Sequence, residues 1–548
     1  MECSLSEILS LIEKLSTQGG QISEYECLVA LLSTVKDGDL KVIARSCDIM
    51  QLFSSMNLND KRFMEAALKL ASTLFSAVPA VELVNAHQAE LLQALHSERT
   101  VLMEFVLTKL KDSVQQVKSH LCCIPEAILH EVICLVAHED LKVSKAAVSF
   151  LSVIGTKFVD GVERLFNPSS VLLINSTCVT SEQMLRIVEM ATDVAVRIPS
   201  KFKQIEASGI LRPLLKGLAD EDSLTNLNFI EIAKNVVLIP DGYEWLVDSG
   251  ALNNLLVRLK GANEVASGHL LLPGYLLFFG CLALQNPEYW LSNCEPISRN
   301  TFLSCLVDAG TNLDPTISLA ALESIGQIAG RHEGRKVLHK LSTYSGVLHP
   351  ILTKLGQFIK NSSNTVCVRA LDSLTKLTQQ VTHSVNVADA TEQAKITLEW
   401  AGCVGQMGNS TELPTLGSQL QSAGKLLKRL TILATNPYSD IRLAALKAVC
   451  AFSTQPWGAR LIIDQPGFME YLLNRNTEVG LQETPQLMET KYEIVSNVLS
   501  TSESSKRYEF SEFLVLLRPE QVACLRLYVK EGVWGVQQAQ STVAVEPS

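Results

Sequence analysis

The chain has 548 residues, of which 47% are hydrophobic and 19% charged, and its 57 acidic and 47 basic side chains give a formal net charge of −10 at pH 7. This length exceeds what one hydrophobic core supports, so it predicts several domains or one elongated array, and the apolar fraction excludes a largely disordered chain. The acidic balance argues against a nucleic-acid partner, because phosphate-binding surfaces need an excess of Lys and Arg.

The first 130 residues show helical patterns without a clear repeat. Apolar residues recur at helical intervals over residues 5–15, 28–35, 62–75 and 89–95. Acidic Glu2 and Glu7 stand where a secretory signal would carry basic residues, so we expect no export. We predict that residues 1–130 form atypical helical repeats, including the cap that the end of a repeat array requires.

A block of apolar and small residues recurs beyond this point. A β-branched residue is followed by a small residue at offset 4 and by apolar residues at offsets 5 and 8, over residues 143–151, 317–325, 366–374 and 441–449. These offsets place the side chains on one helical face, where the small residue lets a neighbouring helix approach closely. The small position is occupied by Ala147, Ala321, Ala370 and Ala445.

A second block follows several of the first blocks at a nearly constant distance. It begins with Gly161, Gly242, Gly334 or Gly458, which lie 17 or 18 residues after Val143, Leu224, Ile317 and Ile441 in that order. These glycines lie 81, 92 and 124 residues apart, which fits two, two and three units of about 40 to 46 residues, the armadillo/HEAT period. The pattern predicts an all-α, armadillo/HEAT-like α-solenoid, a right-handed superhelix of stacked helical repeats with a concave surface. Ser-Gly and Pro-Gly pairs within the blocks predict helix ends at which glycine takes a positive φ.

The most apolar stretch of the chain is residues 270–284 (LLLPGYLLFFGCLAL). It is shorter than the ~20 residues that span a bilayer, and it contains Pro273, Gly274 and Gly280. We interpret it as a buried helix with a broken entry, and we expect no membrane partner.

The predicted organisation has five parts. Helical repeats continue over residues 131–400, a Gly/Ser-rich loop follows at 401–419, and C-terminal helical repeats occupy 420–535 before a flexible tail at 536–548. The polar runs at 476–490 and 501–509 are also expected to be mobile. Gly402, Gly405 and Gly408 have the spacing of a phosphate-binding loop, but no lysine follows them, so we favour a flexible loop.

Residues typical of catalysis or metal binding do not form a recognisable motif. The 14 cysteines are scattered without a Cys-x-x-Cys pair, which favours free thiols in a reducing compartment over disulfides or zinc. Five candidate ligands alternate with apolar residues at helical intervals, which favours core packing: His120, Cys122, Cys123, His130 and Cys134. We therefore predict no catalytic, cofactor-binding or metal-binding residues, no cofactor, and a protein that is not an enzyme.

A few side chains are candidates for contact with a partner. The basic run Lys425, Lys428 and Arg429 is more typical of a solvated helix face than of a nucleic-acid patch. Tryptophans are enriched in binding hot spots, but Trp457 follows Pro456 at a predicted helix start and is expected to fill the gap between repeats. The others considered are Trp245, Trp400 and Trp534. The sequence leaves the partner-binding residues unknown.

Four segments in the second half resemble a known family. They are residues 267–284 (SGHLLLPGYLLFFGCLAL), 441–478 (IRLAALKAVCAFSTQPWGARLIIDQPGFMEYLLNRNTE), 491–500 (KYEIVSNVLS) and 525–546 (LRLYVKEGVWGVQQAQSTVAVE). They are similar to the 26S proteasome non-ATPase regulatory subunit 5 family, whose members assist assembly of the base of the regulatory particle. Before about residue 130 only the helical character agrees, and residues 401–419 and 501–524 depart from the family pattern.

The resemblance implies a non-catalytic chaperone for assembly of the 26S proteasome regulatory particle base. It implies binding through the solenoid surface to a proteasomal AAA-ATPase, the C-terminal domain of regulatory subunit 7, in a module with regulatory subunit 4 and non-ATPase subunit 2. We expect a monomer in the cytoplasm, with the nucleus as a second compartment. The alternative is a generic armadillo-repeat adaptor or a transport receptor for other proteins.

Overall fold

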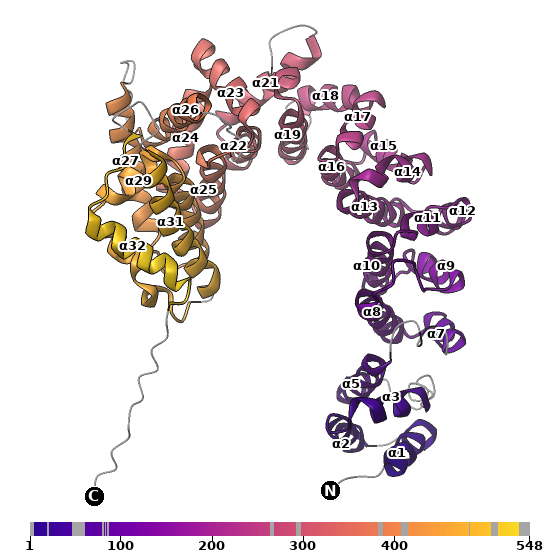
Figure 1. Cartoon of the computed structure of the whole chain (residues 1–548). Coiled ribbons are helices and arrows are strands. Elements are labelled where there is room, and N and C mark those ends of the chain that lie inside the picture. The colour runs from indigo at the N-terminus through magenta and orange to yellow at the C-terminus, as the bar shows by residue number, and fades with distance from the viewer. Residues whose placement is uncertain are drawn as a thin grey trace, which may run out of the picture. The chain divides into compact units, whose positions relative to one another are not determined.

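The structure, a computed structural model of the chain, describes residues 5–18, 21–46, 61–78, 82, 84, 87–262, 268–291, 297–381, 387–406, 415–481, 483–505 and 513–535. Every regular element in these ranges is a helix, which confirms the predicted all-α class. The helices group into two compact units, residues 1–251 (unit 1) and 252–548 (unit 2). Within each unit, helices stack in layers as they do in armadillo and HEAT repeats (Figure 1).

Six helices of unit 1 form one layer in which each contacts the next: α2, α5, α8, α10, α13 and α16. We call this layer the unit 1 ladder; α7, α9, α11, α12, α14, α15 and α17 form a second layer beside it (Figure 1). The helices of unit 1 are α1 (Leu5–Gln18), α2 (Ile22–Leu32), α3 (Asp37–Ser46), α5 (Lys61–Ala77), α7 (Gln88–Leu95), α8 (Thr100–Gln116), α9 (Glu126–Leu135), α10 (Leu141–Lys157), α11 (Gly161–Leu165), α12 (Pro168–Thr177), α13 (Ser181–Arg197), α14 (Phe202–Ala207), α15 (Arg212–Leu218), α16 (Ser223–Val237) and α17 (Pro240–Asp248).

Unit 2 repeats this arrangement with a ladder of α19, α22, α25, α28 and α31, and α32 packs against its last member. Its helices are α18 (Ala251–Gly261), α19 (Gly268–Gln285), α20 (Pro287–Leu291), α21 (Ile297–Gly310), α22 (Pro315–Ala329), α23 (His332–Ser345), α24 (Leu348–Asn361), α25 (Asn364–Thr378), α26 (Val387–Gly405), α27 (Leu416–Leu433), α28 (Ser439–Ser453), α29 (Pro456–Asp464), α30 (Phe468–Leu473), the 3-10 helix η3 (Arg475–Glu478), α31 (Thr484–Ser504) and α32 (Pro519–Glu531).

The first sequence block marks ladder helices. It lies on α10, α22, α25 and α28, and its four alanines are all fully buried where one ladder helix meets the next. Polar side chains cap the starts of three ladder helices. Asp140, Asp222 and Asp314 accept a hydrogen bond from a backbone N–H in the first turn of α10, α16 and α22, respectively. The predicted helix register is therefore confirmed.

The second sequence block marks the helices α11, α17, α23 and α29, which follow the ladder helices α10, α16, α22 and α28. The predicted breaks after it also hold, since the backbone has a positive φ at Gly209, Gly250, Gly346 and Gly467. These positions favour glycine because a Cβ makes this backbone conformation costly.

Residues 270–284 lie within α19, which packs against α22. By length and composition α19 is apolar enough to cross a membrane, but 56% of the helix is buried inside the structure, as expected for a core helix. Contrary to the predicted broken entry, α19 continues through Pro273. Pro273 lies in the second turn of α19, close to the start of the helix, where the missing N–H of proline is better tolerated than in the middle of a helix.

The predicted loop at residues 401–419 is wrong at both ends. Residues 401–405 complete α26 and residues 416–419 begin α27, and these two helices pack along each other. A Cβ on Gly405 would lie 2.1 Å from the carbonyl oxygen of Ser422, so this glycine serves a close helix contact rather than flexibility. Residues 407–414, including Gly408, lie outside the described residues.

Two other predicted boundaries and one predicted mobile run also differ from the structure. Residue 130 lies within α9 and residue 400 within α26, because stacked repeats share one continuous core and composition does not change at a unit border. Within the polar run 476–490, Glu478 is fully buried and α31 begins at Thr484. Residues 501–504 belong to α31 as well, whereas residues 506–512 and the predicted tail, 536–548, lie outside the described residues.

Candidate protein-binding surfaces

The candidate tryptophans have different surroundings. Trp457 is fully buried, donates a hydrogen bond from Nε1 to Thr397 Oγ1 at 3.1 Å, and stacks edge-on against Phe452 at 4.8 Å between ring centres. It therefore fills a gap between helices, as predicted. Trp400 is buried and Trp245 half-buried, whereas Trp534 is 56% exposed.

The candidate metal ligands in residues 120–134 are used in separate contacts. The imidazole of His130 lies 3.6 Å from Glu126, and Cys134 Sγ lies 4.0 Å from Thr177 Oγ1. Burial raises the pKa of Cys122. Within the part of the chain that the structure describes, no three His, Cys, Asp or Glu side chains are grouped as metal ligands.

One cysteine lies beside a histidine, in the arrangement that nucleophilic catalysis requires. Cys403 Sγ is 3.4 Å from His349 Nδ1. Burial, and then the charge of Glu399, raise the pKa of Cys403 to about 12. The thiol therefore stays protonated near neutral pH, which makes it a poor nucleophile.

The basic run on α27 has the predicted character of a solvated face. Lys425 and Lys428 are exposed, and Arg429 donates a hydrogen bond to the backbone carbonyl of Lys360 at 3.1 Å. Arg429 is thereby tied to the end of α24, whereas the two lysines face the solvent.

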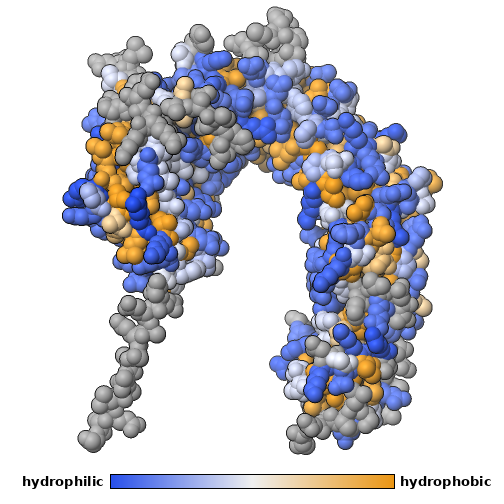
Figure 2. Space-filling view, viewed as in Figure 1, coloured by the Kyte–Doolittle hydropathy of each residue, from blue (hydrophilic) through white to orange (hydrophobic). Residues whose placement is uncertain are grey.

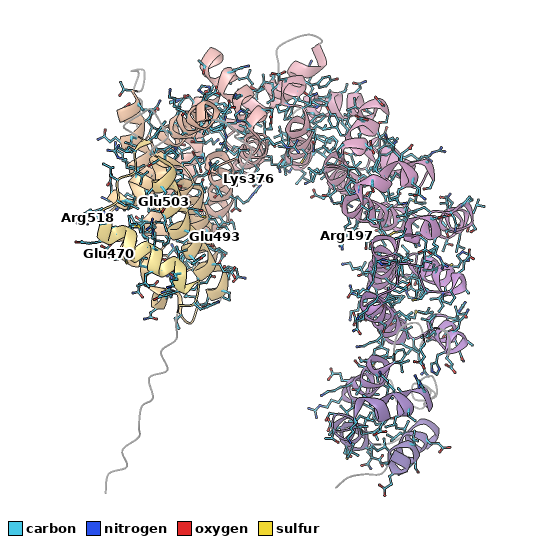
Figure 3. All side chains as sticks on the ribbon, viewed as in Figure 1. Arg197, Lys376, Glu470, Glu493, Glu503 and Arg518 are labelled. Carbon is cyan, nitrogen blue, oxygen red and sulfur yellow. The ribbon has the colours of Figure 1, made fainter. Side chains whose placement is uncertain are left out.

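A row of charged side chains crosses the ladder helices of unit 2. We call it the charged strip; it consists of Glu323 on α22, Arg369, Asp372 and Lys376 on α25, Lys447 on α28 and Glu493 on α31. Figure 3 shows Lys376 and Glu493 on one side of unit 2, with Glu470 and Arg518 on the opposite side. These two members of the strip, on α25 and α31, therefore lie on the same side of unit 2.

An ion pair joins two members of the charged strip across neighbouring helices. Arg369 Nε lies 2.7 Å from Glu323 Oε1, which joins α25 to α22. Asp372 is accessible to water, yet its partly enclosed position raises its pKa, while the positive charges of Lys447 and Lys376 oppose that rise. Mixed charges favour specific protein recognition, and the paired Arg369 and Glu323 lose little side-chain freedom on binding.

The α31 end of the charged strip also includes a thiol. Cys450 lies 3.7 Å from Glu493 Oε2, and the Asn497 side-chain amide donates to Cys450 Sγ at 3.5 Å. Burial, followed by the neighbouring Glu493, raises the pKa of Cys450 to about 12. This thiol is a neutral packing group at the strip and not a reactive one.

A buried ion cluster supports this end of the ladder. Glu478 accepts hydrogen bonds from Arg442 at 2.7 Å, from Tyr471 at 2.7 Å and from Thr477 at 3.0 Å. Lys491 Nζ lies 3.4 Å from Glu478, and both side chains are fully buried. The cluster thereby links α28, α30, η3 and α31.

Burial and pairing act in opposite directions on this cluster. Burial alone would raise the pKa of Glu478, but hydrogen bonds from Arg442 and Tyr471 hold it below its usual value. Burial lowers the pKa of Lys491 to about 8, although Glu478 counteracts the shift. Lys491 keeps its proton at neutral pH through Glu478, the Asn474 carbonyl at 2.8 Å and the Thr477 hydroxyl at 2.7 Å.

Arg475 fastens α32 to the rest of unit 2. Its guanidinium donates to the carbonyls of Gly532 at 2.9 Å and Tyr528 at 3.2 Å, and pairs with Glu531 at 3.0 Å. It also lies over the ring of Tyr528, 4.0 Å from the ring centre. Positive charge at the C-terminal end of a helix is favourable, because the last carbonyls carry partial negative charge.

Sequence reasoning missed the charged strip, although the repeat contains a signal for it. Glu323, Asp372 and Lys447 each stand two residues after the small alanine of their block. A two-residue step rotates a helix by about 200°, so this position points away from the buried alanine. Charge at that offset in successive blocks is the pattern that marks an exposed ladder face.

Comparison with known proteins gives a family and several relatives. The family described as "Proteasome non-ATPase 26S subunit" matches residues 6–548. The 26S proteasome non-ATPase regulatory subunit 5 of Bos taurus is 23% identical over 543 residues, covering 99% of each chain. The Homo sapiens protein of the same name is 23% identical over 548 residues, again covering 99% of both.

Solved structures with similar helical stacking share little sequence. The structure of She4p aligns with 97% of this chain and 83% of its own, with a TM-score of 0.44 and 10% identity. An engineered protein aligns with 86% of this chain and 98% of its own, with a TM-score of 0.34 and 16% identity. The full-length family match, together with the two stacked-helix units, shows that this chain is a member of the proteasome non-ATPase 26S subunit family, alongside the regulatory subunit 5 proteins.

Proposed function

We propose that this protein is a non-catalytic chaperone for assembly of the base of the 26S proteasome regulatory particle. The family match over residues 6–548 supports a proteasome-related role. Within that role, the chain would bind a proteasomal ATPase subunit, the C-terminal domain of regulatory subunit 7, and hold it until later subunits join. It would act as a monomer in the cytoplasm, on a module that also contains regulatory subunit 4 and non-ATPase subunit 2.

The observation that carries the proposal is the charged strip. Its alternating signs, with Arg369 and Glu323 paired and Asp372 beside two lysines, offer specific charge complementarity to a folded domain. A stack of helices presents this surface without refolding, so association costs little ordering entropy. Reversible release then needs only a competitor for the same surface of the ATPase domain.

A binding experiment on the full chain tests this assignment. The purified chain is titrated with the isolated C-terminal domain of regulatory subunit 7, and we expect saturable binding. Reversing two charges, in Lys376→Glu with Lys447→Glu, should weaken binding by about tenfold or more if the charged strip is the contact. The matched control is Lys425→Glu with Lys428→Glu on α27, which lies outside the ladder, and should bind as the unaltered chain does.

Recovery from cytosol distinguishes this proposal from a transport receptor. Affinity capture with the full chain should retain free ATPase modules without the proteasome core cylinder. Capture of proteins that carry basic transport signals, with no ATPase subunit present, would instead support the adaptor alternative.

A further inference from the structure

A second surface lies in unit 1, separate from the charged strip. A groove of about 720 Å³ runs over the ladder helices α8, α10, α13 and α16. We call it the unit 1 groove. Figure 1 shows these four helices side by side, and Figure 2 shows mixed hydrophilic and hydrophobic surface along unit 1. Arg197, which lines the groove on α13, projects away from the α11 and α12 side (Figure 3).

Three of the ladder helices at the groove, α8, α10 and α13, run parallel. Arg186, near the start of α13, donates to the carbonyls of Val136 and His138, just before α10 begins. Lys157, at the end of α10, donates to the carbonyl of Gln115 at the end of α8. A segment crossing these helices would therefore meet equivalent positions of successive repeats in turn, as an extended chain can.

The groove contains a buried hydroxyl without a partner. Thr192 lines the groove and is 2% exposed, and its Oγ1 makes no hydrogen bond within the structure. Helical threonines usually bond to the carbonyl four residues earlier, as Thr156 does to Ser152 at 2.7 Å and Thr177 to Leu173 at 2.8 Å. The Thr192 hydroxyl is closed to solvent in the unbound chain, and a buried polar group left unpaired costs roughly 1 to 3 kcal/mol. A bound main chain that reaches Thr192 as the groove adjusts would therefore gain a hydrogen bond.

The charges around the groove leave an excess of free cations. Its acidic residues are partly neutralised by neighbours, since Asp193 pairs with Arg197 at 3.0 Å and Glu231 pairs with Lys234. Among the described residues no ion pair or hydrogen bond is recorded for the side chains of Lys111 and Lys145, which both line the groove. Glu189 is the remaining groove carboxylate without a recorded pair. This local balance contrasts with the chain's net charge of −10.

Apolar side chains lie between these charges. Leu141 is 52% exposed and Val196 39% exposed on the groove wall, while Met190 and Ile232 form buried parts of it. A lining that combines apolar and basic groups suits a strand-like segment, whose side chains point alternately to opposite sides. Carboxylates in the same groove disfavour a polyphosphate backbone by like-charge repulsion.

We propose that the unit 1 groove binds an extended, acidic peptide segment of a partner protein. Carboxylates of the segment pair with Lys111 and Lys145, and its apolar residues contact Leu141 and Val196. Its main chain bonds to the Thr192 hydroxyl once the side chains that cover this hydroxyl move aside. Four helices at spacings of about 8 to 10 Å accommodate about eight or nine extended residues. This site does not depend on the ATPase contact proposed for unit 2. It gives the chain a second binding surface for a multi-subunit partner.

The test uses the full chain and a fluorescein-labelled peptide of about nine residues that alternates Asp and Val. Fluorescence polarisation should show saturable binding that weakens as NaCl rises from about 50 mM to about 500 mM. Lys111→Glu with Lys145→Glu should weaken binding by about tenfold or more, since two attractions become repulsions. The control pair Lys425→Glu and Lys428→Glu in unit 2 should leave the affinity unchanged.

A second variant separates ligand contact from structure. Thr192→Val keeps the side-chain shape but removes the unpaired hydroxyl, so the melting temperature should stay the same or rise, while peptide affinity falls by about threefold or more. Equal binding of a peptide that alternates Lys and Val would overturn the proposal. So would the absence of saturable binding, or unchanged affinity in the Lys111/Lys145 double variant.

Discussion

A Cβ on Gly334 would lie 2.0 Å from the carbonyl oxygen of Ile328, the residue just before the end of ladder helix α22. The same relation, at 2.1 to 2.4 Å, joins Gly161 to Ile154, Gly242 to Val236 and Gly458 to Phe452. In each pair the glycine belongs to the helix after a ladder helix and packs directly on the backbone of that ladder helix. This contact explains why the distance between the two sequence blocks is nearly constant.

We predict that Gly458→Ala destabilises unit 2. Its new methyl group would meet the backbone oxygen of Phe452 at 2.1 Å, and a backbone group cannot move aside as a flexible side chain can. The expected loss is about 1 to 3 kcal/mol in the free energy of unfolding, measured by urea denaturation. Gly424→Ala on α27 is the control, because its Cβ would have one ordinary contact at 3.6 Å, and we expect it to be neutral or stabilising by about 0.5 to 1 kcal/mol. Equal effects of the two changes would contradict this packing.

The ladder alanines give a second prediction. Ala445 on α28 is fully buried where α28 packs between α25 and α31. Ala445→Leu should lower stability by roughly 1 to 3 kcal/mol through overpacking, and Ala321→Leu on α22 should behave alike. Ala523 on α32 is exposed, so Ala523→Leu serves as the control. Thermal unfolding followed by circular dichroism measures the difference, and an unchanged melting temperature for Ala445→Leu would refute the helix register.

Much of the fold follows from the sequence because packing imposes a period. The small alanine of the first block is buried between ladder helices, and its recurrence in the sequence predicts the stack of helices. These alanines are Ala147, Ala321, Ala370 and Ala445. The contact at Gly334 adds a second constraint at a fixed distance. Local steric demands of this kind recur in several repeats, so a single chain displays them several times.

Other features were not predictable because they depend on partners distant in sequence. The sequence predicts a flexible loop at Gly402 and Gly405, yet they lie where α26 packs closely against α27. Glu478 lies in a polar run, and its burial depends on Arg442 and Lys491, which belong to two other helices. Glycines and charged residues occur both in exposed loops and in close helix contacts. Composition alone does not distinguish these two environments.

The buried ion cluster gives a third prediction, about two variants with unequal effects. Glu478→Gln should destabilise unit 2 by about 3 to 5 kcal/mol, because it leaves the charges of Arg442 and Lys491 without their carboxylate. Lys491→Met should lower the free energy of unfolding by a smaller amount. The pKa of Lys491, about 8, shows that burial opposes its charge more than pairing supports it. In this variant Glu478 also keeps its hydrogen bonds from Arg442 and Tyr471. Urea denaturation at neutral pH compares them, and a larger loss in Lys491→Met would contradict this balance.

The same cluster predicts a pH dependence. The pKa of Lys491 is about 8 in the folded chain, below about 10.4 for an unfolded lysine. Between these values the unfolded chain binds more protons, so the contribution of Lys491 to the free energy of unfolding rises as pH increases from about 8 to about 10.4. The pKa of Glu478 is lowered, so its contribution is present above the unfolded value and is lost as pH falls through the folded value. The difference in unfolding free energy between the unaltered chain and Lys491→Met should therefore increase above pH 8, and a constant difference would contradict the shift.

A further prediction concerns Arg475 and the last helix. Removing this guanidinium in Arg475→Ala deletes the hydrogen bonds to the carbonyls of Gly532 and Tyr528, the pair with Glu531 and the contact with the Tyr528 ring. Because these contacts join α32 to η3, we expect faster backbone hydrogen exchange over residues 519–535, with exchange in unit 1 unchanged. Arg526→Ala is the matched control, since Arg526 pairs only at an exposed site with Glu503, and exposed pairs contribute about 0 to 1 kcal/mol. If exchange over residues 519–535 were the same in both variants, Arg475 would not be the residue that fastens α32, and the packing of Tyr528 and Leu525 would hold the helix instead.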